Sequence, residues 1–242
     1  MKGSNSSNQD DAKPAFRWSE VVDWNRINYM NKKQTTTLIV QELIKMYPDA
    51  DCTLDFKDPW KLLISGILAS QCTDARVNLV TPILFAKYPT ISALAQADIS
   101  SIELIIKSCG FYHVKAKSIH GSMNLLLNRF DGEVPKTMKE LLTLPGVGRK
   151  IANLILGDCY GLPSIVVDTH CGRISHHLGL TDSKEPARIE RDLAALIPRE
   201  QWIGYGHRMV AHGRALCKAR SPQCASCALR PLCRKGQETI GQ

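Results

Sequence analysis

Residues 144–150 read LPGVGRK and separate two stretches with helical patterning. The proline fixes one backbone angle, and Gly146 and Gly148 permit the positive φ angles that a tight turn between helices uses. Such a hairpin exposes backbone N–H groups at the start of the next helix, where they can hold a phosphate whatever the base sequence. An ordinary helix–helix turn is the alternative, but the cations Arg149 and Lys150 on the opening turn favour a phosphate site.

Apolar residues recur at helical spacing on both sides of this turn. Trp60, Leu63, Ile64, Ile67 and Leu68 fall at i, i+3, i+4, i+7 and i+8, which forms one apolar stripe. The best strand candidate, at 165–167, is too short to support a sheet. The sequence therefore predicts an all-α fold. Helices are also expected around residues 77–84, 119–130, 151–155 and 189–197.

Length and composition exclude several classes of protein. The chain has 242 residues, enough for one large or two modest domains, and a hydrophobic fraction of 44%, which excludes disorder through most of it. No run approaches the length of apolar sequence that a membrane span needs. Residues 1–29 show no helical period and no secretory signal, so we predict a flexible tail over residues 1–30 and a reducing compartment for the protein.

The positive charge lies in particular parts of the chain. Lys and Arg total 31 against 23 Asp and Glu, a net charge of +8, and residues 1–30 contribute four of each sign. Residues 201–237 contain seven basic residues and no acidic one. A solvated basic surface and a surface for a polyanion such as nucleic acid both fit this pattern, and charge alone favours neither.

Four of the nine cysteines form a cluster with the spacing C-x6-C-x2-C-x5-C: Cys217, Cys224, Cys227 and Cys233. In a reducing compartment, thiols this close indicate a metal site before disulfides, and the five scattered cysteines are expected to be packing residues. Zinc sites usually pair two short knuckles, whereas only one is present here. The spacing therefore favours a [4Fe–4S] cluster over zinc.

A metal cluster in this segment could act as an electron carrier or as a structural support. A structural cluster would fold the last basic segment into a rigid loop and direct Lys218 and Arg220 outward. The density of positive charge around the cysteines favours the structural role.

Lys150 and Asp168 each have an ordinary and a chemical interpretation. Lys150 could be a second phosphate contact, but a lysine in the first turn of a helix feels the positive end of the dipole, which favours the neutral amine that a nucleophile needs. Asp168 precedes an expected helix, so capping that helix is its ordinary role.

Taken together, these motifs resemble the endonuclease III family, helix-hairpin-helix DNA glycosylases with an iron–sulfur cluster. The resemblance covers residues 31 to about 235 in the family's order. The segments that carry it are LPGVGRK at 144–150, VDTHCGR at 167–173, HGR at 212–214, the four-cysteine cluster, SQCTD at 70–74 and GFY at 110–112.

The resemblance implies two helical domains with DNA across the cleft between them. One is a six-helix barrel over residues 52–162 that ends in the helix-hairpin-helix. The other is discontinuous, joins residues 31–51 to 163–242 and carries a [4Fe–4S] cluster on the four clustered cysteines. The implied protein is a bacterial-type cytoplasmic monomer associated with the nucleoid.

The resemblance also assigns roles to single residues. Lys150 matches the catalytic lysine and Asp168 the catalytic aspartate. Gln71 matches the residue that fills the gap left by a flipped base, and Phe111 stands where an aliphatic wedge is common. The residues expected to touch the DNA are Gln71, Phe111, Gly146, Gly148, Arg149, Lys218 and Arg220.

The implied activity is that of a bifunctional DNA glycosylase/AP lyase of base excision repair. It would remove oxidised or otherwise damaged pyrimidines from duplex DNA and cut the abasic site by β-elimination through a lysine Schiff base. The alternatives are a monofunctional adenine-mismatch glycosylase, whose members generally lack a lysine at position 150, a noncatalytic iron–sulfur DNA-binding or redox-sensing protein, and a zinc-stabilised binding protein.

Overall fold

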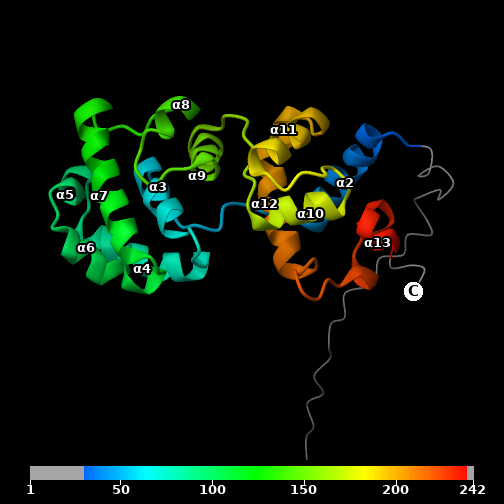
Figure 1. Ribbon diagram of the computed structural model, residues 1–242, viewed down its shortest axis with the longest axis horizontal. Helices are drawn as coiled ribbons and strands as arrows, with labels where there is room; N and C mark the ends of the chain where they lie inside the picture. Colours follow the sequence, from blue (N-terminus) through cyan, green and yellow to red (C-terminus); the bar gives the residue numbers. More distant parts are fainter. Residues whose placement is uncertain (1–29, 239–242) are drawn as a thin grey trace, which may run out of the picture.

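The computed structural model describes residues 30–238, and all regular elements in that range are helical (Figure 1). The all-α prediction is confirmed, and residues 165–167 form no strand. The tail predicted over residues 1–30 lies outside the described residues except for Met30. Within the described range, none of the helices combines the length and hydropathy that crossing a bilayer requires.

The helices form two groups that lie side by side along the long axis of the molecule (Figure 1). We call the group that contains α3 to α9 the first lobe, and the group that contains α2 and α10 to α13 the second lobe. The first lobe consists of α3 (Pro59–Leu68), α4 (Asp74–Lys87), α5 (Ile91–Ala95), α6 (Ile99–Ile106), η2 (Lys107–Cys109), α7 (Tyr112–Arg129), α8 (Met138–Leu141), α9 (Arg149–Leu154) and the π-helical turn η3 (Ile155–Cys159). The second lobe consists of α2 (Lys32–Met46), α10 (Thr169–His177), α11 (Pro186–Leu196), η4 (Arg199–Gln201), α12 (Trp202–Ala215), η5 (Cys224–Ser226), η6 (Arg230–Leu232) and α13 (Arg234–Glu238).

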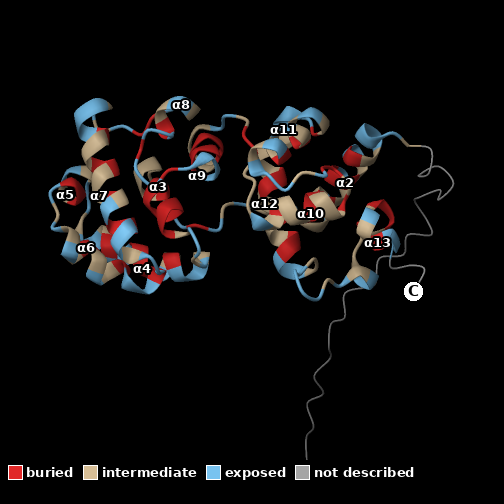
Figure 2. Ribbon diagram, viewed as in Figure 1, coloured by how far each residue is buried: buried red, intermediate tan, exposed pale blue. Residues whose placement is uncertain are grey.

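Each lobe has its own hydrophobic core (Figure 2). The first core runs from Leu54 to Leu156 along the chain, and its centre is α3, where every residue from Leu62 to Leu68 is buried. The second core combines Ile39 and its neighbours on α2 with side chains between Ile165 and Leu232. The domain limits implied by the resemblance stay a prediction, and the two cores lie within those segments.

The apolar stripes seen in the sequence lie on the predicted helices and face these cores. Val77, Val80 and Leu84 are buried on α4, and Ile189 and Leu193 are buried on α11. Thr73 caps α4 by accepting a hydrogen bond from the Arg76 N–H.

Candidate functional site

The glycine-rich turn at 144–150 forms the predicted hairpin before α9. Gly146 has φ of +76°, and a Cβ built there would lie 2.7 Å from Ser118 Cβ, so both the backbone angle and the packing demand glycine. Gly148 caps α9 with φ of −96°, an angle that any residue can adopt, and no atom lies within 4 Å of a Cβ built there. The turn therefore needs a positive φ at Gly146 alone, while Gly148 leaves open space at the helix start.

The start of α9 also lacks a side-chain cap, so its first N–H groups have no side-chain acceptor. Behind the turn, Ser122 Oγ on α7 donates to the Pro145 carbonyl oxygen at 2.8 Å. The hairpin is thus anchored on its inner side and presents backbone donors on its outer side. This arrangement suits an anion such as a DNA phosphate.

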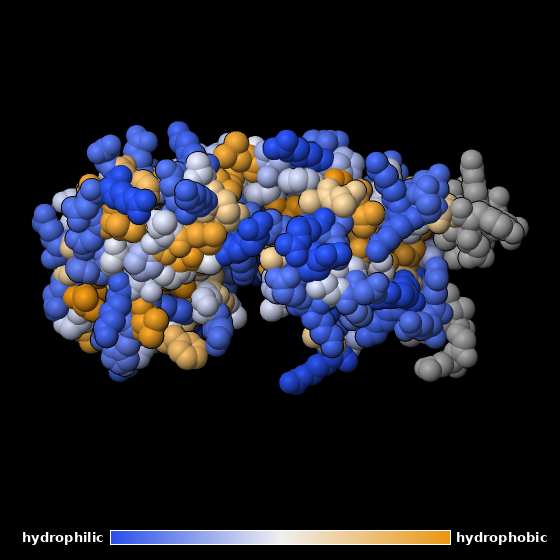
Figure 3. Space-filling model, turned by 45° about the horizontal axis from the view of Figure 1, so that its top comes forward, coloured by the Kyte–Doolittle hydropathy of each residue, from blue (hydrophilic) through white to orange (hydrophobic). Residues whose placement is uncertain are grey.

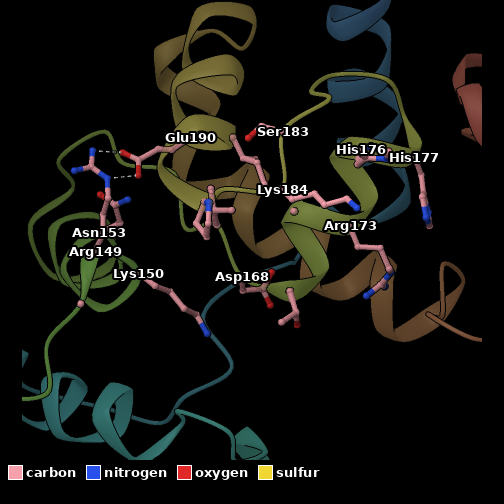
Figure 4. A pocket seen from close by; sticks show the side chains of 16 residues that line it. Arg149, Lys150, Asn153, Asp168, Arg173, His176, His177, Ser183, Lys184 and Glu190 are labelled. Carbon is pink, nitrogen blue, oxygen red and sulfur yellow. Dashed lines mark hydrogen bonds and ion pairs between the residues drawn. The ribbon is translucent and has the colours of Figure 1, made fainter.

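Lys150 and Asp168 lie on opposite sides of one hollow. Lys150 is exposed on the first turn of α9, and Asp168 is the N-cap of α10. Asp168 Oδ1 accepts a hydrogen bond from the Cys171 N–H at 2.7 Å, so the capping role is confirmed and Oδ2 is left for other partners. Figure 4 shows the Lys150 side chain extending from α9 into the space beside Asp168. The two groups predicted to do the chemistry therefore share a cavity.

A second hollow lies between the lobes and contains more of the predicted residues. It is lined by Gln71, Gly146, Gly148, Lys150 and Asp168, together with side chains from α12. Figure 3 shows an indentation of the surface between the lobes and mostly hydrophilic side chains on that face. Of the predicted site, the structure thus brings the hairpin, Lys150, Asp168 and Gln71 to one cleft. Its lining does not include Phe111, Arg149, Lys218, Arg220 or the four clustered cysteines.

Charged groups from both lobes meet in this cleft. Arg214 Nη2 donates to Asp74 Oδ2 at 2.6 Å. Burial raises the pKa of Asp74, but hydrogen bonds from Thr53 and Arg214 and the charges of Arg214 and Lys150 outweigh burial and hold it below its usual value. Asp74 therefore remains ionised beside two cations.

His170 packs behind Asp168 in the same cleft. Burial lowers the pKa of His170, and the charges of Arg173, Arg214 and Lys150 lower it further against the opposing effect of Asp168. A Cβ on Gly213 would lie 2.1 Å from His170 Nδ1, so the glycine of the HGR motif is what lets α12 approach α10. The imidazole is thus held neutral at neutral pH next to the carboxylate.

Gln71 and Phe111 are both exposed and both have left-handed backbones, with φ of 52° and 47°. Non-glycine residues rarely adopt such angles, and strained conformations of this kind are concentrated at functional sites. Phe111 is 65% exposed, which is unusual for a large apolar side chain. The geometry suits side chains that act on something outside the protein.

Lys115, which was not predicted from the sequence, lies beneath these two loops. Its Nζ is buried and donates to the carbonyl oxygens of Leu68 and Cys109 at 2.9 and 2.7 Å. Leu68 comes just before the Gln71 loop, and Cys109 comes just before the Phe111 loop. Burial lowers the pKa of Lys115. One signal was present in the sequence: Lys115 stands four residues before Ile119, in line with the buried stripe of α7.

Arg149 is engaged within the protein. Its Nε and Nη2 donate to the two carboxylate oxygens of Glu190 at 2.6 and 2.8 Å, which ties α9 to α11 (Figure 4). Glu190 also raises the pKa of Arg149. The predicted DNA contact at Arg149 therefore has a competing partner inside the chain, and it stays a prediction.

The four clustered cysteines line one cavity in the second lobe. Their sulfurs are spread out, since no three of them, all within the described residues, lie within 4.8 Å of one another. Four sulfurs around one zinc ion, each at about 2.3 Å, would be only about 3.8 Å apart. The donor set therefore fits a larger body, such as an iron–sulfur cluster, better than a single zinc ion.

Two histidines approach this cavity. His177 Nδ1 lies 3.7 Å from Cys217 Sγ, and His212 Nε2 lies 3.7 Å from Cys227 Sγ. The other ring nitrogen of His212 is 3.0 Å from the hydroxyl of Tyr47, the C-cap residue of α2. These contacts connect the cysteine loop to the second core.

Comparison with known proteins agrees with the geometry. The family model of the HhH-GPD superfamily of base excision DNA repair proteins matches residues 64–199. The chain is 50% identical over 208 residues to endonuclease III of Synechocystis sp., covering 86% of this chain and 95% of that protein. It is 41% identical over 194 residues to endonuclease III of Bacillus subtilis, covering 80% and 89% of the two chains.

Two solved structures of endonuclease III with DNA are also similar. One is a non-covalent complex, with a TM-score of 0.84 and 42% identity over 88% of this chain and 100% of that chain. The other is a trapped covalent intermediate, with a TM-score of 0.83 and 42% identity over 87% of this chain and 100% of that chain. The chain belongs to the endonuclease III family of helix-hairpin-helix base excision DNA repair proteins.

Proposed function

We propose that the cleft between the lobes binds duplex DNA and that Lys150 and Asp168 make the protein a bifunctional DNA glycosylase/AP lyase of base excision repair. One observation carries the proposal: Lys150 and Asp168 line the same cleft as the hairpin in a chain similar to the trapped covalent endonuclease III–DNA intermediate. Because one chain supplies both walls of the cleft, a monomer is the proposed active unit.

Recognition begins with the backbone of the DNA. The open helix start at Gly148 supports a phosphate contact beside the lesion. Flipping a damaged pyrimidine out of the stack costs a few kcal/mol, and least for a poorly stacked base, which contributes selectivity. The exposed loops at Gln71 and Phe111 would fill the gap that the base leaves.

The chemical steps use the amine of Lys150. Its nitrogen attacks the sugar C1′, the C1′–N bond to the base breaks, and the sugar ring opens to give a Schiff base. β-Elimination then removes a proton from C2′ and breaks the bond from C3′ to the 3′ phosphate oxygen. Asp168, whose Oδ2 is not used by the helix cap, would accept the proton of Lys150 or stabilise the cationic sugar.

The four cysteines are proposed to hold a [4Fe–4S] cluster through their thiolates. The spread of the sulfurs and the shared cavity support this assignment. When bound, such a cluster supplies a rigid covalent anchor for the last segment of the chain. The exposed side chains of Lys218 and Arg220 between these cysteines would then lie ready for DNA phosphates.

Borohydride trapping tests the assignment of the nucleophile. Wild-type protein mixed with duplex DNA carrying an oxidised pyrimidine should form a covalent adduct, and Lys150→Ala should form none. Lys136→Ala is a matched control, because Lys136 is an exposed lysine of the same lobe that lies over the Tyr160 ring, away from the cleft residues. An adduct in Lys150→Ala, or a peptide map that joins the sugar to another residue, would show that the assignment is wrong.

A further inference from the structure

A second group of potential ligands lies at the junction of the lobes, apart from the residues assigned to catalysis. Asp51, Asp158 and His207 each offer one ligand atom, and these atoms all lie within 4.8 Å of one another. Asp51 belongs to the linker between α2 and α3, Asp158 to the π-helical turn η3, and His207 to α12. The group therefore joins the linker and both lobes.

Asp158 is the most unusual member of the group. Its side chain is only 5% exposed, and Oδ1 lies 2.7 Å from His207 Nε2. Oδ2 is buried and has no hydrogen-bond partner among the described residues. A buried carboxylate oxygen without a partner is costly, so this atom points to a ligand that the protein chain does not itself supply. π-Helical turns of this kind are frequent at functional sites.

The nearby basic side chains do not neutralise the group. Lys57 and Lys61 line the same hollow as Asp51 and Asp158. Lys61 Nζ pairs with Asp58 at 2.6 Å, and neither lysine forms an ion pair with Asp51 or Asp158. Arg214 on the same helix as His207 pairs with Asp74. Among the described residues, no Lys or Arg nitrogen lies within ion-pair distance of Asp158, whose Oδ1 contacts the imidazole of His207. Two carboxylates thus stand together with one imidazole.

We propose that Asp51, Asp158 and His207 bind a divalent cation that joins the two lobes beside the cleft. Two carboxylate oxygens and one imidazole nitrogen suit ions such as Mn²⁺ or Zn²⁺. Ligand atoms at about 2.0–2.2 Å from an ion lie roughly 3–4 Å apart, so small side-chain rotations would complete the site. His207 would bind through neutral Nε2, which exchanges its contact with Asp158 for the ion and releases any proton that it carries.

The position of the ion would have a mechanical consequence. One ligand comes from the linker, one from the end of the first core and one from the helix that forms the cleft wall of the second lobe. A bound cation would therefore restrain the angle between the lobes. It would take no part in the chemistry of Lys150.

A Mn²⁺ titration of the whole protein tests this site. Weakly bound divalent ions are first removed with a chelator, the cysteine site is left as isolated, and no DNA is present. Mn²⁺ is the probe, because it prefers oxygen and imidazole ligands to thiolates and its free form is measured by electron paramagnetic resonance. Wild-type protein should bind one Mn²⁺ per chain. Asp158→Asn and Asp51→Asn should each weaken binding by about tenfold or more. Asp55→Asn removes an exposed carboxylate from the same linker outside the group and should bind as wild type does.

Thermal unfolding supplies an independent readout. Mn²⁺ should raise the unfolding midpoint of the wild type and of Asp55→Asn, and at the same Mn²⁺ concentration it should raise the midpoints of Asp51→Asn and Asp158→Asn by less. If Asp158→Asn does not fold, Asp51→Asn is compared with the wild type, because Asp51 is exposed. Absence of a one-to-one site in the wild type, or equal Mn²⁺ affinity in Asp51→Asn, would overturn the proposal and leave Asp158 and His207 as an ion pair between the lobes.

Discussion

Arg214 on α12 and Asp74 at the start of α4 are 140 positions apart in the chain, yet Arg214 Nη2 lies 2.6 Å from Asp74 Oδ2. The contact crosses from the second lobe to the first. Asp74 also accepts a hydrogen bond from Thr53 in the linker. One carboxylate therefore ties together the linker and both walls of the cleft, so its ionisation bears on how the cleft is held.

Asp74 should make the stability of the protein depend on pH. Its pKa in the folded protein lies below the ordinary value of about 3.9, so its contribution is present above that value and is lost as the pH falls through the lower folded pKa. We expect Asp74→Asn to lower the free energy of unfolding by about 1 kcal/mol at pH 7, because the ion pair is partly exposed. Denaturant unfolding of both proteins should show the difference shrinking below about pH 4. A difference that persists unchanged at low pH would contradict this account.

The two glycines of the hairpin should respond differently to alanine. Gly146→Ala places a Cβ against Ser118 and strains a positive φ, so we expect a loss of about 1–3 kcal/mol in the free energy of unfolding. Gly148→Ala has open space and an ordinary φ, so stability should change by less than about 0.5 kcal/mol. If a phosphate occupies that space, Gly148→Ala should still weaken DNA binding. Fluorescence anisotropy with duplex DNA measures the affinity. An affinity equal to that of the wild type would show that no DNA phosphate contacts Gly148.

Substitutions can separate the two roles of Asp168, which are to cap α10 and to supply a carboxylate for catalysis. Asn caps helices as well as Asp does, so Asp168→Asn should keep the hydrogen bond from the Cys171 N–H and fold with near wild-type stability. Removing the charge should nevertheless slow base release by about 10²–10⁴-fold, the usual contribution of an acid or base. Asp168→Ala should lose both the activity and about 1 kcal/mol of stability. Full activity in Asp168→Asn would reduce this residue to a helix cap.

The sequence predicted the elements that depend on local pattern and missed those that depend on distant contacts. Helical spacing located α3, α4 and α7, because their stripes bury against one core. Short helices such as α5 (Ile91–Ala95) carry too few residues to show a period. The contact of Arg149 with Glu190 joins elements 41 positions apart, and no local pattern indicates it.

The candidate site shows the same division. The motif around Lys150 and the capping position of Asp168 could each be predicted from one short stretch of sequence. The fold brings the two stretches together at the cleft. The group of Asp51, Asp158 and His207 could not be predicted from the sequence, because none of the three residues belongs to a local motif. These three residues become neighbours where the linker, the π-helical turn and α12 meet.

Salt dependence should show whether the cysteine loop touches DNA. Each phosphate contact contributes roughly 0.9 to the slope of log affinity against log salt concentration. Lys218→Ala/Arg220→Ala should therefore reduce the slope by up to about 1.8. Arg188→Ala is a suitable control, because its guanidinium already pairs with Asp192 at 3.0 Å. A slope equal to that of the wild type would place the loop outside the DNA interface.

Lys115 should position the two exposed loops through a buried amine. Lys115→Met keeps the length of the side chain but leaves the carbonyls of Leu68 and Cys109 without this donor, which should cost about 1–3 kcal/mol of stability. The Gln71 and Phe111 loops should then lose their fixed placement. We expect slower base flipping, measured with a fluorescent base analogue in the duplex at a temperature where the variant is fully folded.

Destabilisation by itself must be separated from this positioning effect. Ile119→Val removes one methyl group from the same face of α7, where Ile119 is fully buried, and should cost about 0.5–1.5 kcal/mol without touching either loop. Flipping should therefore stay at the wild-type rate in Ile119→Val and fall in Lys115→Met. Equal rates in the two variants would mean that the amine holds the fold of the first lobe and does not set the position of Gln71 and Phe111.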